Sequence, residues 1–268
     1  MNLREFLTTR PALKRIALFL LRAKAPFGSF VPLSAMKGYW RLYSDWRRFR
    51  QMGGQAKVLD FYPCLFDNLA KSSIDAHYFH QAAWAFRKIA ANRPTRHVDV
   101  GSDVNYVGML TAILPVTFVD IRPLELSIPN YEGLNGSVLS LPFSDDSVES
   151  LSSLHVIEHI GLGRYGDPLD PLGSVKAAKE IIRVLRPGGK AYISAPIGKS
   201  RVQFNGQRIF AIAEVLDMFA GLKLVELSIV DPSGRFVQAA TADSSLIDDV
   251  NTGADCCLGM FELIKAEA

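Results

Sequence analysis

From residue 97 onward, short apolar runs alternate with segments of helical periodicity, and this alternation is the strongest constraint on the fold. Strands are expected at 97–100, 116–120, about 135–139, 149–155, 190–195, 222–230 and 256–265, and helices at about 105–113, 173–186 and 211–220. Strands interleaved with helices indicate βαβ units with right-handed crossovers. The sequence therefore predicts a doubly wound, mostly parallel α/β sheet with helices on both faces.

The residues before this pattern are organised differently. An amphipathic helix is expected over 73–91, and Asn92-Arg93-Pro94 stops it. Two further helices are expected in the first 52 residues. We therefore divide the chain into a basic, helical N-terminal extension, residues 1–60, and an α/β domain, residues 61–268. Residues 232–254, rich in Ser, Asp, Gly and Thr, are expected to form a long loop between the last two strands.

The extension differs from the body in charge. Residues 1–50 hold eleven Lys and Arg against Glu5 and Asp45, a net charge of +9, so the remaining residues carry −6 of the total of +3. A basic segment of this kind indicates an anionic surface such as lipid headgroups, nucleic acid or a phosphorylated carrier. The apolar stretch 16–21 is far shorter than the roughly 20 residues that span a bilayer. A helix packed on the body is favoured over a helix lying on a membrane.

Five aromatic residues of the extension recur at near-helical spacing. They are Tyr39, Trp40, Tyr43, Trp46 and Phe49. Interleaved aromatics and arginines could stack on nucleic-acid bases, but this spacing favours a packing face, so nucleic acid is disfavoured as a partner. The three cysteines, Cys64, Cys256 and Cys257, have no metal-ligand spacing, so neither a disulfide framework nor a metal site is predicted. A cytoplasmic location is expected.

The first strand of the alternating region runs into a loop that suits a nucleotide-sized ligand. It reads His-Val-Asp-Val-Gly-Ser-Asp over 97–103, directly before a helix. Gly101 allows close approach of the backbone, and the helix N-terminus offers free N–H groups. Asp120 ends the second strand, where a carboxylate in a Rossmann-like sheet accepts hydrogen bonds from ribose hydroxyls. The structural alternatives are a strand-end cap for Asp120 and an ordinary strand-to-helix turn at Gly101.

Further landmarks follow in a fixed order. Leu-Pro-Phe occupies 141–143, His-Val-Ile-Glu-His occupies 155–159, and Leu-Arg-Pro-Gly-Gly occupies 185–189 before a strand. With these landmarks the chain resembles the class I S-adenosylmethionine-dependent methyltransferases over about residues 95–230. The resemblance implies a Rossmann-like fold, S-adenosylmethionine as cofactor, and methyl transfer as the activity.

The resemblance also implies positions for the cofactor. Asp99, Gly101 and Ser102 would surround its methionine part, with Asp103 in the same loop, and Asp120 and Ile121 would hold the ribose. Ser137 and Val138 would meet the adenine edge, and His155 would form the floor near the sulfonium. Two residues depart from the family pattern, because Asp103 replaces a loop glycine and Ser137 replaces an adenine-binding Asp. A non-glycine residue excludes binding only where the backbone requires a positive φ.

A narrower resemblance concerns the segments 158–171, 196–198 and 204–210, which look like an uncharacterised methyltransferase-like family of unknown function, some of whose members are associated with surface-glycan gene sets. Both loops would follow carboxyl ends of strands, where open α/β sheets bind ligands. The candidate substrate-binding residues are Arg164, Tyr165, Asn205 and Arg208, and the candidate catalytic residues are His155, His159, Arg164 and Asp167. An Arg can grip phosphate or carboxylate, and a His or Asp can accept a hydroxyl proton. The alternative is a rigid turn in which Arg164 pairs with Asp167 or Asp170.

These observations lead to one preferred hypothesis and two rivals. The chain is expected to be an S-adenosylmethionine-dependent methyltransferase that methylates oxygen on a small-molecule or glycan-precursor acceptor, with residues 1–50 available for peripheral membrane contact. The first rival is a catalytically silent binding or scaffold protein, which Asp103 and Ser137 favour. The second is a nicotinamide-dependent oxidoreductase, which the landmarks at 141–143 and 185–189 and the lack of a G-x-G-x-x-G loop disfavour.

Overall fold

A computed structural model of the chain describes residues 33–68, 74–238, 248, 250 and 256–267. The chain divides into two compact units, residues 1–73 and 74–268, and each is described by itself. The apolar stretch 16–21, the more N-terminal of the two expected helices and much of the basic segment lie outside the described residues.

In the first unit, the helix expected around Met36–Met52 is present as α3, Leu33–Gln51, followed by a short 3-10 helix, η2, Val58–Asp60. Trp46 of α3 donates its Nε1–H to the carbonyl of Ala56 at 3.0 Å and packs edge-on against Phe61, with ring centroids 5.5 Å apart. Arg41 donates to the carbonyl of Leu65 at 3.0 Å. Part of the aromatic and basic face of α3 thus packs against the segment that follows it.

The second unit is built on one large sheet with the strand order β3-β2-β1-β4-β5-β10-β8-β9. The strands from β3 to β5 are parallel, β10 is antiparallel to both β5 and β8, and β9 is antiparallel to β8. Their bounds are β1 His97–Val100, β2 Val116–Asp120, β3 Tyr131–Asn135, β4 Val148–Leu154, β5 Leu185–Ile197, β8 Lys223–Val230, β9 Phe236–Val237 and β10 Cys257–Ile264. The predicted doubly wound, mostly parallel α/β fold is confirmed.

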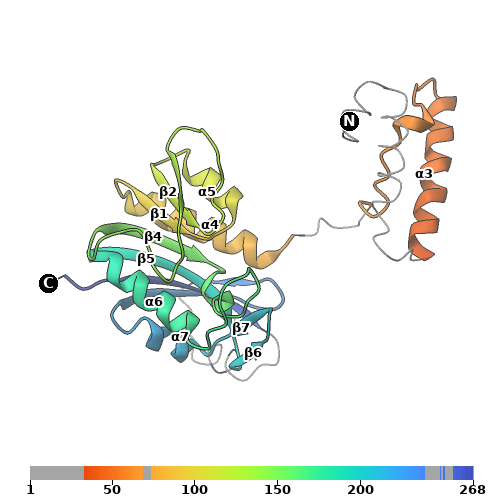
Figure 1. Cartoon of the computed structure of the whole chain (residues 1–268). Coiled ribbons are helices and arrows are strands. Elements are labelled where there is room, and N and C mark those ends of the chain that lie inside the picture. Colours follow the sequence, from red (N-terminus) through yellow and green to blue (C-terminus); the bar gives the residue numbers. More distant parts are fainter. Residues whose placement is uncertain (1–32, 69–73, 239–247, 249, 251–255, 268) are drawn as a thin grey trace. The chain divides into compact units, whose positions relative to one another are not determined.

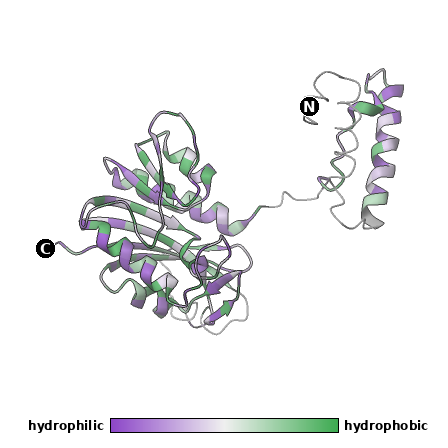
Figure 2. Ribbon diagram, in the orientation of Figure 1, coloured by the Kyte–Doolittle hydropathy of each residue, from purple (hydrophilic) through white to green (hydrophobic). Residues whose placement is uncertain are grey.

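Helices cover both faces of this sheet (Figure 1). On one face, α4, Ala76–Asn92, and α5, Val104–Leu110, pack Trp84, Ile89 and Leu110 against buried strand residues. On the other, α6, Gly173–Val184, and α7, Ile212–Met218, contribute Ile181 and Val215 to a second core. In Figure 2, α6 and α7 alternate between hydrophobic and hydrophilic residues, as amphipathic helices do when one side faces a sheet.

Three details differ from the prediction. The strand expected near 135–139 is β3, Tyr131–Asn135, because Ser137 begins a tight turn in which its Oγ accepts from the N–H of Leu139 at 3.2 Å. β5 extends from Leu185 to Ile197, so it includes the Pro-Gly-Gly segment, with a register irregularity against β4. The hairpin of β6, Arg201–Gln203, and β7, Gln207–Ile209, was not predicted, because strands this short carry too few residues to show alternation.

Helix α6 holds one of the sequence landmarks, the Leu-Pro-Phe loop, in place. Glu180 of α6 accepts a hydrogen bond of 2.8 Å from the N–H of Leu141, the first residue of the Leu-Pro-Phe loop. Arg183, one turn later, donates to the carbonyls of Leu141 and Phe143 at 3.2 and 2.9 Å and pairs with Glu180 at 2.7 Å. Glu180 and Arg183 thus form a clamp between α6 and the Leu-Pro-Phe loop, which leads into β4.

Candidate functional site

A pocket of about 510 Å³ opens at the carboxyl ends of β1, β2 and β4. Ligands bind at this edge of open α/β sheets, and the volume lies in the range of about 300–1,000 Å³ usual for small-molecule sites. Of the predicted site residues, the lining includes Gly101, Asp120, Ile121, Ser137, Val138, His155, His159, Tyr165 and Asp167. Nine positions chosen from sequence are therefore brought together at one cavity.

Gly101 and Asp120 lie opposite each other where β1 and β2 end. Gly101 has φ +70°, and a Cβ there would lie 3.3 Å from a methyl of Val156 and 3.7 Å from Oδ2 of Asp120. Asp120 accepts a hydrogen bond of 2.7 Å on Oδ1 from the N–H of Arg122. Oδ2 is thus the carboxylate oxygen nearest the space that a side chain at Gly101 would fill, in a position to accept from a ligand hydroxyl.

Asp99 and Ser102, predicted to surround the ligand, do not line the pocket. Their side chains instead hold the loop after β1 through buried hydrogen bonds. Asp99 is fully buried and accepts hydrogen bonds from the N–H of Ser102 at 3.1 Å and from the hydroxyl of Ser152. Burial raises the pKa of Asp99 to about 6, against the opposing effect of these hydrogen bonds. The Ser102 hydroxyl accepts from the N–H of Leu154 at 3.0 Å, which fastens the loop to β4.

Asp103, the residue that replaces the family's loop glycine, begins helix α5. Its φ is −61°, and its carboxylate accepts from the N–H groups of Asn105 and Tyr106 at 2.9 and 3.3 Å. Asp is among the preferred residues at this capping position. The backbone at Asp103 does not need glycine, so this departure from the family pattern does not distort the loop.

Ser137 and Val138 form the wall of the pocket beyond β3. The turn that starts at Ser137 is closed by a hydrogen bond of 2.9 Å from the N–H of Ser140 to the Ser137 carbonyl, and Val138 is 6% exposed. Ser137 therefore contributes to the pocket wall by forming this turn. It does not offer the carboxylate that an Asp at this position would offer.

The floor is formed by the residues that follow β4. His155 has φ +56°, and its Nδ1 lies 2.5 Å from Oε1 of Glu158, which is completely buried. His159, in the 3-10 helix η3, Ile157–His159, donates from Nδ1 to the carbonyl of Gly206 at 2.8 Å. Burial lowers the pKa of His159, the nearby Glu158 carboxylate opposing this effect, so His159 is neutral near pH 7.

The loop 160–171 forms one side of the pocket, and Asp167 closes a turn within it. The Asp167 carboxylate accepts from the N–H of Gly161 at 2.6 Å and from the N–H of Tyr165 at 3.3 Å. Arg164 donates to the carbonyl of Gly206 at 3.2 Å, which is a different contact from the pairing with Asp167 or Asp170 that the sequence left open. The loop is thus a turn held by its own hydrogen bonds, like the rigid turn of the alternative interpretation, although with a different partner for Arg164. Tyr165 and Asp167 nevertheless line the pocket.

Asn205 and Arg208, two of the predicted substrate-binding residues, do not line the pocket. Asn205 lies between β6 and β7 with φ +62°. Arg208 is 8% exposed and donates to the carbonyls of Ile160 and Asp170 at 2.6 and 3.2 Å. Arg208 therefore ties the β6–β7 hairpin to the loop 160–171, which is a structural contact.

The sequence did not indicate two polar residues of the site. Arg122 lines the pocket, and its guanidinium lies 5.5 Å from the ring centroid of Tyr165, while that of Arg164 lies 5.2 Å from the same centroid. Its place two residues after Asp120 is not a pattern that could have indicated it. Glu158 was quoted as part of a motif but given no role, because sequence does not show that its carboxyl group is buried beside His155.

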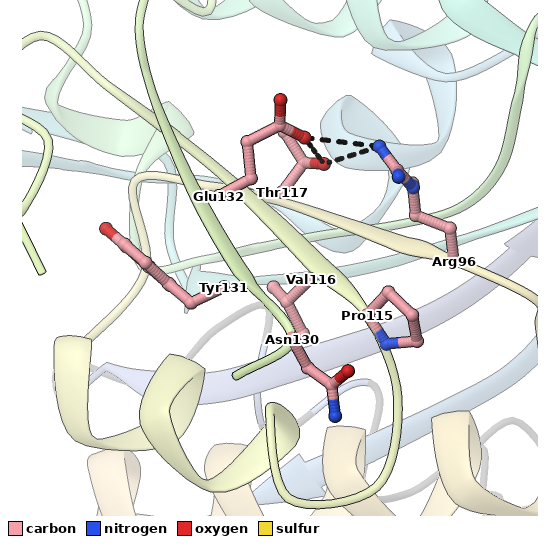
Figure 3. Close-up of a pocket in the computed structure, with 7 residues that line it drawn as sticks. All are labelled: Arg96, Pro115, Val116, Thr117, Asn130, Tyr131 and Glu132. Carbon is pink, nitrogen blue, oxygen red and sulfur yellow. Dashed lines mark hydrogen bonds and ion pairs between the residues drawn. The ribbon is translucent and has the colours of Figure 1, made fainter. Parts of the chain in front are cut away.

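A second pocket, of about 410 Å³, lies at the opposite edge, where β2 and β3 begin (Figure 3). Arg96 donates to Glu132 at 3.1 Å, and the hydroxyl of Thr117 donates to the same carboxylate at 3.0 Å. These groups therefore satisfy one another, and nothing in this pocket points to a ligand. Within the described ranges, no three His, Cys, Asp or Glu side chains are arranged to hold a metal ion.

Comparison with known proteins supports the fold. Residues 142–240 match the model of a family described as Caenorhabditis protein of unknown function, DUF268. A demethylmenaquinone methyltransferase from Chlorobaculum tepidum is 28% identical over 166 residues, which cover 58% of this chain and 64% of the relative. The match thus spans slightly less than two thirds of that curated relative.

Among solved structures, a candidate sarcosine dimethylglycine methyltransferase from Galdieria sulphuraria superposes with a TM-score of 0.50, at 14% identity, over 71% of this chain and 86% of that chain. A 1,6-didemethyltoxoflavin-N1-methyltransferase from Burkholderia thailandensis, solved with S-adenosylhomocysteine, has a TM-score of 0.47 at 15% identity, over 88% of this chain and 93% of that chain. The first of these likenesses establishes the fold.

Proposed function

From the class I methyltransferase fold that this chain has, we propose that it is an S-adenosylmethionine-dependent methyltransferase. The observation that carries the proposal is the position of the Asp120 carboxylate opposite Gly101 at the head of a pocket of about 510 Å³. The curated relative at 28% identity, itself a methyltransferase, supports the same reaction class. The negative φ at Asp103 removes one of the two observations that favoured a silent scaffold.

The residues present fit the cofactor. Gly101 leaves room that a side chain would fill, Asp120 offers a carboxylate oxygen for the ribose hydroxyls, and Ser137 and Val138 offer a wall for the adenine. When bound, S-adenosylmethionine would supply an already activated methyl group. The chain then has to align the acceptor with it, and alignment alone can contribute a large part of the rate.

We place the acceptor beside the loop 160–171, where Arg122 and Arg164 flank Tyr165. Arg122 lines the pocket, whereas Arg164 is exposed beside it, and such guanidinium groups suit an acceptor that carries a phosphate or carboxylate group. Methylation of oxygen on a small molecule, and a glycan precursor as that molecule, are the finer parts of the proposal. The second of these rests on the resemblance of the segments 158–171 and 204–210 to the uncharacterised family.

Calorimetric titration of the protein with S-adenosylmethionine and S-adenosylhomocysteine tests the cofactor proposal without knowledge of the acceptor. We expect micromolar binding, about −8 kcal/mol. Asp120→Ala should weaken it at least about tenfold, because it removes a charge-assisted hydrogen bond worth about 1.5–3 kcal/mol. Glu125→Gln is the matched control, since Glu125 is an exposed acidic residue in the segment after β2 and does not line the pocket.

The rivals predict different titrations. A silent scaffold would give no heat with either ligand at millimolar concentration, and an oxidoreductase would bind a nicotinamide dinucleotide instead. Equal binding by wild type and Asp120→Ala would remove Asp120 from the cofactor site.

We further propose that the basic segment 1–50 contacts the surface of an anionic membrane from the cytoplasmic side, a proposal supported by its net charge of +9. Among the residues that the structure describes, no helix is both long and apolar enough to cross a bilayer. Co-sedimentation with vesicles of anionic and of neutral lipids tests the proposal. Binding to anionic vesicles that a variant lacking residues 1–50 loses would support it, and equal sedimentation of both proteins would oppose it.

A further inference from the structure

Three ionisable side chains converge on the floor of the pocket, within the segment 155–159. His155 directly follows β4 and has a positive φ, and its N–H donates to the carbonyl of Ser194 at 3.1 Å, so its backbone is fixed. Positive φ at a residue other than glycine is uncommon, although His tolerates it better than most, and such residues cluster at active sites. The floor therefore has the strained, anchored backbone expected where a side chain must be aimed.

The carboxyl group of Glu158 determines which ring nitrogen of His155 carries the proton. Glu158 is completely buried, and its Oε1 lies 2.5 Å from Nδ1 of His155. A carboxylate only accepts hydrogen bonds, so Nδ1 must donate. In neutral His155 the lone pair is then on Nε2. A histidine whose Nδ1–H is held by a carboxylate has the arrangement that general bases use.

Nε2 of His155 is buried and has no hydrogen-bond partner in the described part of the protein. The ring is covered by α4, with Tyr78 stacked at 5.3 Å and His77 at 5.9 Å between centroids. Buried polar atoms in native proteins are nearly always paired, so the unpaired acceptor of His155 calls for a donor from elsewhere. His155 lines the pocket, and a hydroxyl group of a bound acceptor molecule would supply that donor.

The other predicted catalytic candidates differ from His155 in their contacts. His159 uses Nδ1 to donate to the carbonyl of Gly206, and its Nε2 faces Oε1 of Glu158 at 3.7 Å. Both carboxylate oxygens of Asp167 accept from backbone N–H groups of its own turn. Arg164 is a donor only. Of the two histidines, His155 is the one whose Nδ1 is held by a carboxylate, and this contact selects it as the base.

We propose that His155 and Glu158 form a base dyad for methylation of a hydroxyl acceptor, in which His155 is the catalytic residue and Glu158 is a positioning residue. The inference deepens the proposed function and rests on it. Nε2 accepts the hydroxyl proton as the acceptor oxygen forms its bond to the methyl carbon, and the sulfur keeps the electron pair of the broken carbon–sulfur bond. Glu158 stabilises the imidazolium that forms, and the proton then leaves to solvent. A neutral amine would attack without such a base, so the dyad favours oxygen over nitrogen as the acceptor atom.

The tautomer of His155 can be measured directly by long-range ¹H–¹⁵N NMR on protein labelled in its five histidines. His155→Gln assigns the signal. We expect the Nδ1–H tautomer in the wild type and a lower population of it in Glu158→Met, which keeps the buried volume and removes the carboxylate. A wild-type His155 protonated on Nε2 when neutral would overturn the proposal. The titratable groups that face His155 are His77 and Tyr78 of α4, and Glu158 and His159 of η3.

Binding and transfer measurements separate failure of the dyad from failure of the proposed function. His155→Gln and Glu158→Met should still bind S-adenosylhomocysteine, whereas a wild type that does not bind it would remove the proposed function itself. With radiolabelled S-adenosylmethionine and a panel of phenols, sugars and amines, we expect transfer to hydroxyl compounds that falls at least about 100-fold in His155→Gln. Glu158→Met should lower transfer to hydroxyl compounds at least about tenfold and shift the pH profile of that transfer. The control is His80→Gln, on α4 away from the pocket, which should change neither. Unchanged transfer by His155→Gln would also overturn the proposal.

Discussion

The backbone N–H of Ser102 donates a hydrogen bond of 3.1 Å to the carboxylate of Asp99, which is completely buried beneath the loop after β1. The second oxygen of Asp99 accepts from Ser152 of β4, whose hydroxyl also accepts from Tyr106 of α5 at 3.2 Å. One carboxylate thus connects the loop, a neighbouring strand and the following helix. The shape of the cofactor loop therefore depends on a group that does not line the pocket.

Asp99 should give the free energy of unfolding a measurable pH dependence. Burial raises its pKa from 3.8 to about 6, so between these values the folded protein holds a proton that the unfolded chain releases. The contribution of Asp99 to stability is therefore greatest below pH 4 and falls, by about 3 kcal/mol in total, as pH rises to 6.

Urea unfolding of wild type and Asp99→Asn at pH 4 and pH 7 measures this contribution. The difference in unfolding free energy, wild type minus variant, should decrease between the two pH values, because Asn does not titrate. Differences that are the same at pH 4 and pH 7 would show that Asp99 is not shifted upward.

Gly101→Ala should damage the cofactor site. Its φ of +70° costs a residue with a side chain about 1–2 kcal/mol, and the new Cβ would lie 3.3 Å from Val156 and close to Asp120. We expect lower stability by about that amount and at least tenfold weaker calorimetric binding of S-adenosylhomocysteine.

Gly108→Ala is the matched control for Gly101→Ala. Gly108 lies within α5, and a Cβ there would meet nothing within 4 Å. Alanine in place of glycine inside a helix stabilises by up to about 1 kcal/mol, so this variant should be at least as stable as the wild type and bind normally. Similar losses of stability and binding in both variants would mean that the loop after β1 tolerates a side chain no worse than α5 does.

Sequence predicted the fold more completely than the site because the fold depends on long patterns. Alternation and chain order were enough to locate β1 and β2 at their observed bounds and to bring Gly101 and Asp120 together at one edge. Asp99 and Arg208 carry residue types usual in binding sites, yet their buried hydrogen bonds hold loops. Only three-dimensional contacts separate these two roles.

The same limit explains what was missed. Glu158 shares a motif with His155, but only the turn of η3 buries it against Nδ1. Arg122 reaches the pocket because the chain turns after Asp120, and a single arginine after a strand gives no pattern that predicts this. The short strands β6 and β7 likewise pair only because the loop between them reverses the chain.

Arg208→Lys should destabilise the protein, although its charge is kept. The guanidinium donates to the carbonyls of Ile160 and Asp170 and to the hydroxyl of Ser174, a set that a single ammonium group cannot span. We expect a loss of about 2 kcal/mol in unfolding free energy, since buried carbonyl groups lose their donors.

Arg164→Lys is the comparison for Arg208→Lys, because it makes the same substitution at an exposed arginine. Arg164 is exposed, so this substitution should change the unfolding free energy by less than about 0.5 kcal/mol and leave S-adenosylhomocysteine binding intact. If both variants lost the same stability in urea titrations, Arg208 would not be the tie between the hairpin and the loop 160–171.

Glu180→Gln should weaken the clamp between α6 and the Leu-Pro-Phe loop. The hydrogen bonds from Arg183 hold the pKa of Glu180 below its ordinary 4.5, so the fold prefers the charged form. This contribution is fully present above pH 4.5 and is lost as pH falls through the lowered pKa. At pH 7 the variant should lose about 1 kcal/mol, because an amide pairs less strongly with Arg183 while still accepting from the N–H of Leu141. Chemical denaturation at pH 7 and pH 3 measures the unfolding free energies of the wild type and the variant. If the variant were destabilised as much at pH 3 as at pH 7, the effect would come from the shape of the side chain and not from its charge.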